Sequence, residues 1–276
     1  MGTVLSPPVG FPQYRGKHRA APLFTATEFH RYASRRSGRP LPVPPRGVVL
    51  VFGERWRRYL SQRFRGVYDR GTGLYHVGPN VGIMLVPGPG APFATIVVEE
   101  LAALGVKRFL IVGMAGSLQP GVRVGSYVLC TKALRDEGTS HHYRGPGLYA
   151  HPSADLTKAL RATLAREGVP FAEGPSWTTD AVYRETPPEI RRYRRAGILT
   201  VEMEASAVFA VSGHRGCRAA ALFVISDHLD DAGWEPRFFD TRRPLRQGLT
   251  LAIRTLRAAP GRRRVGTGPS RARPRS

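Results

Sequence analysis

Short apolar runs alternate with longer amphipathic segments through the middle of the chain. Six of the runs have the length of a buried strand and are rich in Val, Ile and Leu, which is typical of strands covered on both faces. These runs predict strands over residues 48–52, 81–86, 108–112, 127–131, 198–201 and 219–225.

Amphipathic segments follow most of these runs. Leu156, Leu160 and Leu164, for example, recur every four residues and so mark one face of a helix. Strands that alternate with helices predict an α/β fold with a mixed central sheet. The helices are expected over residues 92–105, 155–168, 204–212 and 244–258, with a short helix near residues 27–34.

The two ends of the chain differ from the middle in composition. Residues 1–45 are rich in Pro, Gly and Arg, and we interpret them as an N-terminal extension. Residues 260–276 combine Arg, Pro, Gly and Ser with almost nothing to bury, which predicts a basic disordered tail. We therefore expect one domain over residues 46–259. No run reaches the ~20 apolar residues of a membrane span, and the start does not resemble a secretory signal.

The composition indicates which binding partners and which cellular compartment to expect. Basic residues outnumber acidic residues by 42 to 20, for a formal net charge of +22, and almost all of them are Arg. Aromatic residues are not interleaved with the basic ends as base-stacking platforms would be, which argues against nucleic acid as a partner. Cys130 and Cys217 are the only cysteines. Two cysteines exclude a disulfide framework or a cysteine zinc site and fit a reducing cytoplasm.

Glycines and carboxylates gather where the predicted strands end. Ligands of α/β sheets bind beyond the carboxyl ends of the strands, so we expect these residues to line one cleft for a small polar ligand. Neither a dinucleotide G-x-G-x-x-G pattern nor a P-loop occurs. The segments are the Gly-rich turns that begin at Gly53, Pro87 and Gly113, the pair Glu202 and Glu204, and Ser226-Asp-His228.

Four segments carry a resemblance to a known family. They are Val201-Glu-Met-Glu-Ala-Ser206, Val224-Ile-Ser-Asp-His228, Arg135-Asp-Glu-Gly-Thr-Ser140, and Gly105 to Gly113 with Gly116. In them the chain resembles the nucleoside phosphorylases of the purine nucleoside and uridine phosphorylase type, which include nucleosidases. From about Gly47 to Ala258 the resemblance implies a single domain with a mixed sheet and distorted barrel flanked by helices. It also implies phosphate as cosubstrate, no metal or organic cofactor, and homodimers, trimers of dimers or hexamers.

The resemblance assigns the sugar end of the site to the Glu-Met-Glu segment. The family cleaves an N-glycosidic bond through a transition state with positive charge on the sugar, which a carboxylate on the ribose hydroxyls favours. Glu204 takes that role by resemblance, Met203 packs against the sugar, and Glu202 lies near the base. As an alternative, Glu202 and Glu204 form an ordinary acidic first turn of a helix.

The resemblance assigns the base end to residues further along the chain. Asp227 is the expected general acid for the leaving base, with a cap on the following loop as the alternative. Val182 and Tyr183 match the segment that walls the base, or else they pack in the core. The family usually places an Arg beyond the acid to position it, and Arg237, Arg242 and Arg243 all qualify.

The phosphate site departs from the family's pattern. Gly53 and Arg57 match the first phosphate loop, and Arg65 matches the arginine that a neighbouring subunit contributes. Ile111 and Met114 stand where the phosphorylases carry an Arg and a Ser or Thr.

This departure leaves three interpretations open for the nucleophile. Phosphate binds in a modified site built from Arg57, Arg65 and another basic residue, or water is the nucleophile of a nucleosidase. In the third, the chain binds nucleosides without catalysis. For a nucleosidase, Glu54 is the only carboxylate in the first loop. We favour a cytoplasmic phosphorylase of purine nucleosides, because Asp227 is retained.

Overall fold

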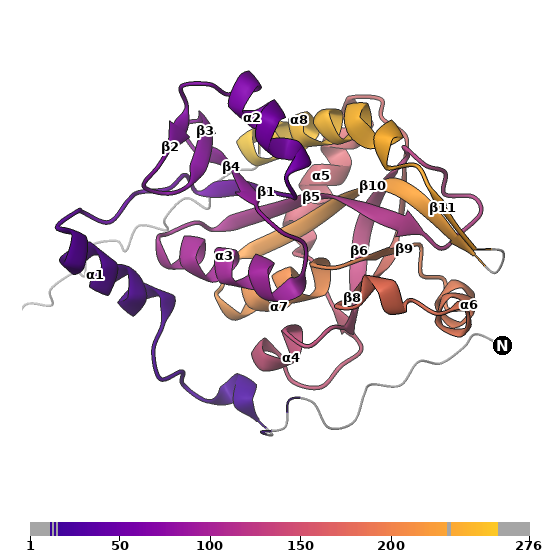
Figure 1. Cartoon of the computed structure of the whole chain (residues 1–276), viewed down its shortest axis with the longest axis horizontal. Coiled ribbons are helices and arrows are strands. Elements are labelled where there is room, and N and C mark those ends of the chain that lie inside the picture. The colour runs from indigo at the N-terminus through magenta and orange to yellow at the C-terminus, as the bar shows by residue number, and fades with distance from the viewer. Residues whose placement is uncertain (1–11, 13, 15, 231–232, 259–276) are drawn as a thin grey trace, which may run out of the picture.

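A mixed sheet of 11 strands forms the centre of the fold (Figure 1). The computed structural model describes residues 12, 14, 16–230 and 233–258. The strands are β1 (Gly47–Phe52), β2 (Tyr68–Asp69), β3 (Leu74–Gly78), β4 (Val81–Val86), β5 (Arg108–Ser117), β6 (Tyr127–Asp136), β7 (Tyr149–Ala150), β8 (Phe171–Thr179), β9 (Thr200–Glu202), β10 (Arg218–Asp230) and β11 (Gly233–Pro236).

Part of the sheet closes into a distorted barrel. Strand β5 pairs with β10 on one side and with β9 on the other, and β6 and β8 complete the ring between them. The ring is mixed, because β5 runs parallel to β10 but antiparallel to β9. Strands β1 and β4 extend the sheet from β5 in parallel. The predicted mixed sheet and distorted barrel are confirmed.

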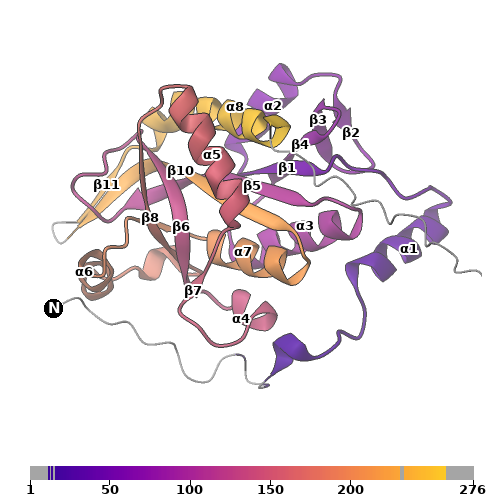
Figure 2. The same ribbon diagram turned by 180° about the vertical axis from the view of Figure 1, so that it is seen from behind.

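Helices cover both faces of the sheet. Helices α3 and α7 lie side by side on one face, whereas α5 and α8 cover the other with α2 nearby (Figures 1 and 2). The helices are α1 (Ala26–Ser37), α2 (Arg55–Arg63), α3 (Ala91–Ala103), α4 (Ser140–Tyr143), α5 (Ala154–Arg166), α6 (Pro187–Arg195), α7 (Ala205–His214) and α8 (Arg242–Ala258), with short 3₁₀ turns η1 (Lys17–Arg19), η2 (Val182–Arg184) and η3 (Phe238–Thr241).

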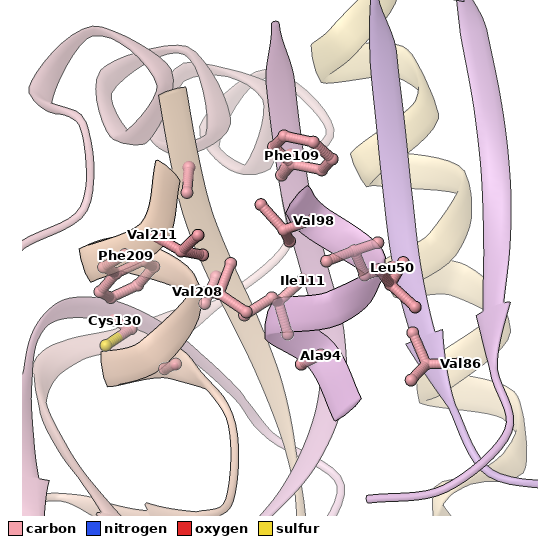
Figure 3. Close-up of a cluster of buried hydrophobic side chains, with 14 of the residues drawn as sticks. Leu50, Val86, Ala94, Val98, Phe109, Ile111, Cys130, Val208, Phe209 and Val211 are labelled. Carbon is pink, nitrogen blue, oxygen red and sulfur yellow. The ribbon is translucent and has the colours of Figure 1, made fainter. Parts of the chain in front are cut away.

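Each face of the sheet buries its own apolar cluster. The cluster beneath α3 and α7 includes Leu50, Val98, Phe109 and Val208 (Figure 3). Ile111 belongs to this cluster and is only 1% exposed, so its side chain fills core. The position where the family's phosphorylases carry an Arg therefore contributes to packing in this chain.

All the predicted strands and helices are present, but three strands run well beyond their expected ends and β9 begins two residues later than expected. We expected a turn from Gly113 to Ser117 and the end of a strand before Ser226 to His228, and both predictions were wrong. Both segments continue as β5 and β10, because barrel closure keeps them hydrogen-bonded to each other beyond the edge of the open sheet. Strand β6 is extended in the same way, through its pairing with β8.

Several elements have no clear apolar pattern in the sequence. Strand β8 carries Glu173, Gly174 and Pro175 in its first half, and this run conceals its strand periodicity. Helix α2 is rich in Arg and buries only Trp56 and Leu60. Strands β2, β3, β7 and β11 and helices α4 and α6 were also absent from the predictions.

The expected N-terminal extension contributes a helix to the domain surface. A capping box begins α1, in which Glu28 N–H donates to Thr25 Oγ1 and Thr25 N–H donates to Glu28 Oε2. The helix packs beside α3, where His30 Nε2 lies 3.1 Å from the Glu100 carbonyl oxygen. The tail predicted over residues 260–276 lies outside the described residues. Among those that are described, no helix is long and apolar enough to span a membrane.

Candidate active site

A cavity of about 630 Å³ opens where β1, β5, β9 and β10 meet. The barrel strands bring together residues that lie far apart along the chain. The predicted site residues that line this cavity are Gly53, Val182, Tyr183, Glu202, Met203, Glu204 and Asp227. Arg57 and Arg65 are not among its lining residues.

The Glu202 carboxylate organises the start of α7. Its Oε2 accepts hydrogen bonds from the backbone N–H groups of Glu204 (2.8 Å) and Ala205 (2.7 Å). Its Oε1 accepts from the hydroxyls of Thr178 and Ser176. Burial raises the pKa of Glu202, and these four donors oppose that shift. Glu202 thus fixes the backbone just before α7, but the alternative of an acidic first turn was wrong, because the helix begins at Ala205 with Glu204 as its N-cap.

Glu204 presents a buried carboxyl to the cavity. Its side chain is 7% exposed, and its Oε1 accepts a hydrogen bond from the Gly90 backbone N–H at 2.6 Å. Burial, with the charge of Glu202 nearby, raises the pKa of Glu204 to about 8. Such a carboxyl gains most from a ligand whose hydroxyls donate to its ionised form.

A β-bulge aims Asp227 at the cavity. The β5–β10 register shifts between Ile225 and Asp227, so Ser226 is the extra residue, and bulges of this kind redirect a side chain. Asp227 lies opposite Gly116, where an added Cβ would stand 3.1 Å from Asp227 Oδ2 and 2.4 Å from Leu229 Cδ1. Only glycine leaves the space that the acid occupies.

Neutral donors hold the Asp227 carboxyl. Ser226 Oγ donates to Oδ1, and Trp234 Nε1 donates to Oδ2 at 2.8 Å. Among the described residues, none of the arginines considered for this role forms an ion pair with Asp227. Arg237 pairs with Asp240 at 3.3 Å. Trp234 was missed because no periodic signal marks β11, although its aromatic side chain lies close after the Ser-Asp-His segment.

Glu185 is a second carboxyl at the same end of the cavity and was also missed. It follows η2 and lines the cavity with Asp227. Burial, followed by the charges of Asp227 and Glu189, raises the pKa of Glu185 to about 7. This end of the cavity thus contains two carboxyl groups, and the charge of one, Asp227, contributes to the raised pKa of the other. Glu185 was missed because a single Glu after Tyr-Arg carries no sequence signal that it would line a cavity.

The arginines near β1 are arranged differently from the prediction. Arg57 forms an ion pair with Glu54 at 2.5 Å, and both side chains are exposed. Arg65 lines a second cavity, with Arg63 and Arg254. Arg55 lines the main cavity and donates to Met114 Sδ at 2.8 Å.

Arg55 is the basic side chain best placed to meet an anion in the main cavity. Burial, followed by the nearby charge of Arg242, lowers the pKa of Arg55. Within the described part of the chain, its guanidinium pairs with no carboxylate.

The expected base wall lies at the cavity mouth. Val182 and Tyr183 come from η2, and Tyr183 is 97% exposed. Plain core packing is therefore excluded for both residues. Over the described ranges, no group of three or more His, Cys, Asp or Glu side chains is arranged to hold a metal ion.

Sequence comparisons match the chain to one superfamily. Residues 57–256 match the family model described as the phosphorylase superfamily. A guanosine phosphorylase from Halorubrum lacusprofundi is 36% identical over 142 residues, which are 51% of this chain and 59% of that protein. The match thus spans less than two thirds of that relative. A DeoD-type purine nucleoside phosphorylase from Myxococcus xanthus is 32% identical over 197 residues, covering 66% of this chain and 80% of the relative.

Solved structures share the fold. An AMP nucleosidase from Bacteroides thetaiotaomicron superposes with a TM-score of 0.69 at 20% identity, covering 85% of this chain and 97% of that one. A uridine phosphorylase from Vibrio fischeri superposes with a TM-score of 0.62 at 25% identity, covering 76% and 91%. The barrel and its flanking helices are therefore those of phosphorylases and nucleosidases alike.

Proposed function

The chain belongs to the phosphorylase superfamily, and from that membership we propose that it cleaves the N-glycosidic bond of a nucleoside with phosphate. The products are a free base and a sugar 1-phosphate. One observation carries the proposal: the buried carboxyls of Glu204, at the N-cap of α7, and Asp227, on β10, line the same cavity. The relatives named guanosine and purine nucleoside phosphorylase support the same reaction.

The sugar end of the proposed site is built on Glu204. One oxygen accepts from Gly90 N–H, so the other can accept from the vicinal hydroxyls of a ribose. Ionised Glu204 then favours the positive charge that develops on the sugar. We propose that Met203 packs against the sugar and that Glu202 acts by holding the backbone of this segment.

The base end of the proposed site is built on Asp227. A purine leaves more readily when its ring nitrogen is protonated, and a carboxyl group in a closed pocket can supply that proton. Val182 and Tyr183 form the outer wall at the mouth. The presence of an acid at this position supports purine nucleosides as the preferred substrates.

The phosphate end combines a backbone turn with arginine. Gly53 lines the cavity with a φ of 84°, and nothing lies within 4 Å of a Cβ added there, so the turn has room for a ligand beside it. We propose that Arg55 provides the charge inside the cavity, since a guanidinium suits phosphate oxygens. Arg57 can join only by leaving Glu54, and Arg65 only from another subunit.

Arg65 also supports an assembly of at least two subunits. It lines a second cavity and not the main cavity of its own subunit, so we propose that it contacts the phosphate of a neighbouring copy. We propose a homodimer as the minimal unit, within trimers of dimers or hexamers. Mass measurement by light scattering after gel filtration tests this, and a monomer with full turnover would exclude the proposed role of Arg65.

The reaction requires no metal or organic cofactor in this proposal. Purified protein treated with EDTA should keep its turnover. We propose a cytoplasmic location because Cys130 and Cys217 are free thiols, as expected in a reducing compartment.

A panel of purine and pyrimidine nucleosides, assayed with and without phosphate, tests the proposed function. Sugar 1-phosphate that forms only with phosphate supports phosphorolysis. Asp227→Asn should slow purine nucleosides, and Glu204→Gln should impair ribose-containing substrates. Full activity in both variants would contradict the site assignment.

Hydrolysis is the second candidate, and specific observations favour it. Ile111 is core, Met114 is a thioether, and Arg57 is already paired with Glu54. Base release at the same rate without phosphate would identify a nucleosidase. Binding of nucleosides with no turnover in either condition would identify a non-catalytic member of the family.

A further inference from the structure

Trp234 donates a hydrogen bond to Asp227, the predicted general acid. The family's pattern does not account for this contact. Trp234 lies on β11, opposite Leu229 of β10, and its side chain reaches diagonally to Asp227. Diagonal neighbours across antiparallel strands lie within reach of large aromatic side chains. The pairing of β10 with β11 therefore sets the Nε1–Oδ2 distance of 2.8 Å.

The indole ring is both exposed and part of the cavity. Trp234 is 59% exposed although its N–H bonds a carboxyl that is only 7% exposed. Phe238, another lining residue, lies with its ring 5.9 Å from that of Trp234. Large aromatic faces exposed beside a polar anchor are typical of a surface that a planar ligand covers.

Resting on the proposed function, we propose that Trp234 is the positioning residue for Asp227 and one wall of the base subsite. Its N–H fixes the carboxyl orientation without placing a positive charge beside it. In the family that role usually belongs to an Arg. The ring faces the space into which a purine would extend from the sugar.

The proton and the electrons balance in the proposed step. Phosphate forms a bond to the anomeric carbon of the sugar as the carbon–nitrogen bond breaks, and the electron pair stays on the base. The Asp227 O–H proton passes to a ring nitrogen of that base. Asp227 becomes a carboxylate, and the donors on its two oxygens, Ser226 Oγ and Trp234 Nε1, then bond a full negative charge. Hydrogen bonds to ionised groups are stronger, so both donors favour the transition state.

Trp234→Phe removes the indole N–H but keeps an aromatic ring, so it tests the hydrogen bond separately from the wall. With inosine, we expect kcat to fall about 10- to 100-fold, the usual effect of one hydrogen bond to a charged group, while KM changes little. With 7-methylguanosine, whose base leaves without taking up a proton, we expect less than a threefold change. Phe239→Leu is the matched control, because Phe239 is an exposed aromatic nearby that does not line the cavity.

Two kinetic outcomes would overturn the role of Trp234. They are an equal loss with both nucleosides and an unchanged kcat with inosine. A wild type that turns over neither nucleoside would contradict the proposed function itself, which is a different result. Circular dichroism and the melting temperature of Trp234→Phe confirm that the variant folds.

Iodide quenching tests the wall independently of turnover. The chain has 3 tryptophans, and Trp56 and Trp177 are 4% and 1% exposed. Iodide quenching therefore reports on Trp234. Hypoxanthine should reduce quenching in the wild type, and quenching that stays unchanged at saturating hypoxanthine would exclude the ring as a base wall.

Discussion

The backbone N–H of Gly90 donates a 2.6 Å hydrogen bond to Oε1 of Glu204, 114 positions further along the chain. Gly90 is the N-cap of α3 and has a φ of 116°, a conformation that residues with a Cβ rarely adopt. The Gly-rich turn after β4 therefore positions one backbone N–H donor against the carboxyl group that we assign to ribose binding.

Gly90→Ala should therefore weaken both the fold and the site. We expect a loss of about 1–3 kcal/mol in unfolding free energy from the strained φ, and a roughly tenfold drop in kcat/KM for nucleosides from the displaced N–H. Urea denaturation and steady-state kinetics measure the two effects. Gly88→Ala is the control, because Gly88 has open space around it and no positive φ. Equal effects of both substitutions would show that the Gly90 contact has no special role.

Glu204→Gln should stabilise the ligand-free protein at alkaline pH while it reduces activity. The pKa of Glu204 rises from 4.5 to about 8 in the folded state. Its contribution to stability is therefore present below pH 4.5 and is lost as pH rises to about 8, since the unfolded chain releases the proton first. At about 1.4 kcal/mol per pKa unit, the loss over this whole range is on the order of 5 kcal/mol.

Unfolding midpoints in urea at pH 5 and pH 8, without nucleoside or phosphate, measure this prediction. Wild type should lose more stability than Glu204→Gln between the two values. Parallel loss in both proteins would mean that Glu204 is ionised in the empty cavity.

Gly116→Ala should disturb the acid directly. The added Cβ would lie 2.4 Å from Leu229 Cδ1 and 3.1 Å from Asp227 Oδ2, and overpacking of this kind costs about 1–3 kcal/mol. We expect lower stability and a fall in kcat with purine nucleosides of at least about tenfold. Gly121→Ala, at a glycine with nothing within 4 Å, should leave both unchanged. A fully active Gly116→Ala enzyme would show that the site tolerates a shift of Asp227.

The sequence predicted the secondary-structure elements better than it predicted which of them contact each other. Periodicity reports which face of a segment is buried, and this is enough to locate β1, β4 and the helices α3, α5 and α8. It carries no information on which strands pair. The closure of the barrel by β5 and β10 joins segments about a hundred residues apart. It extends β5 through the expected turn at Gly113 and β10 beyond its expected end at Ile225.

The candidate site shows the same difference between residues that the sequence predicts and contacts that it does not. Glu204 and Asp227 stood out because they follow predicted strands, and the resemblance to the family assigned their roles. The donors that hold these carboxyls, Gly90 and Trp234, depend on distances set by the folded backbone. Arg57 was predicted from its position in the loop, but its orientation depends on Glu54 three residues earlier.

Arg55→Met and Arg57→Met should differ in their effect on phosphate. Arg55 lines the cavity without a carboxylate partner among the described residues, whereas Arg57 is paired with Glu54. We expect Arg55→Met to raise KM for phosphate about 10- to 100-fold, as for a lost hydrogen bond to a charged group. Arg57→Met should raise it less than threefold. Calorimetric titration with inorganic phosphate alone provides a second measurement, and the reverse order would restore Arg57 as the ligand.

Glu185→Gln should alter the pH dependence of the base-leaving step. The pKa of Glu185 is raised to about 7 by burial, followed by the charges of Asp227 and Glu189. Below pH 7 a proton is held on this group beside Asp227, and above pH 7 Glu185 is ionised. Like charges in one pocket disfavour double ionisation, so the charge of Asp227 helps to keep the proton on Glu185. We therefore expect kcat with inosine to fall above pH 7 in the wild type.

In Glu185→Gln that descending limb should move by at least half a pH unit or disappear. Glu235→Gln is the matched control, since Glu235 is an exposed carboxyl on β11 that does not line the cavity. Its profile should coincide with that of the wild type. The measurement is kcat from pH 5 to pH 9 at saturating phosphate, because kcat reports groups in the bound complex. If Glu185→Gln and wild type shared one descending limb, Glu185 would have no part in holding the proton, and Asp227 would act alone at the base.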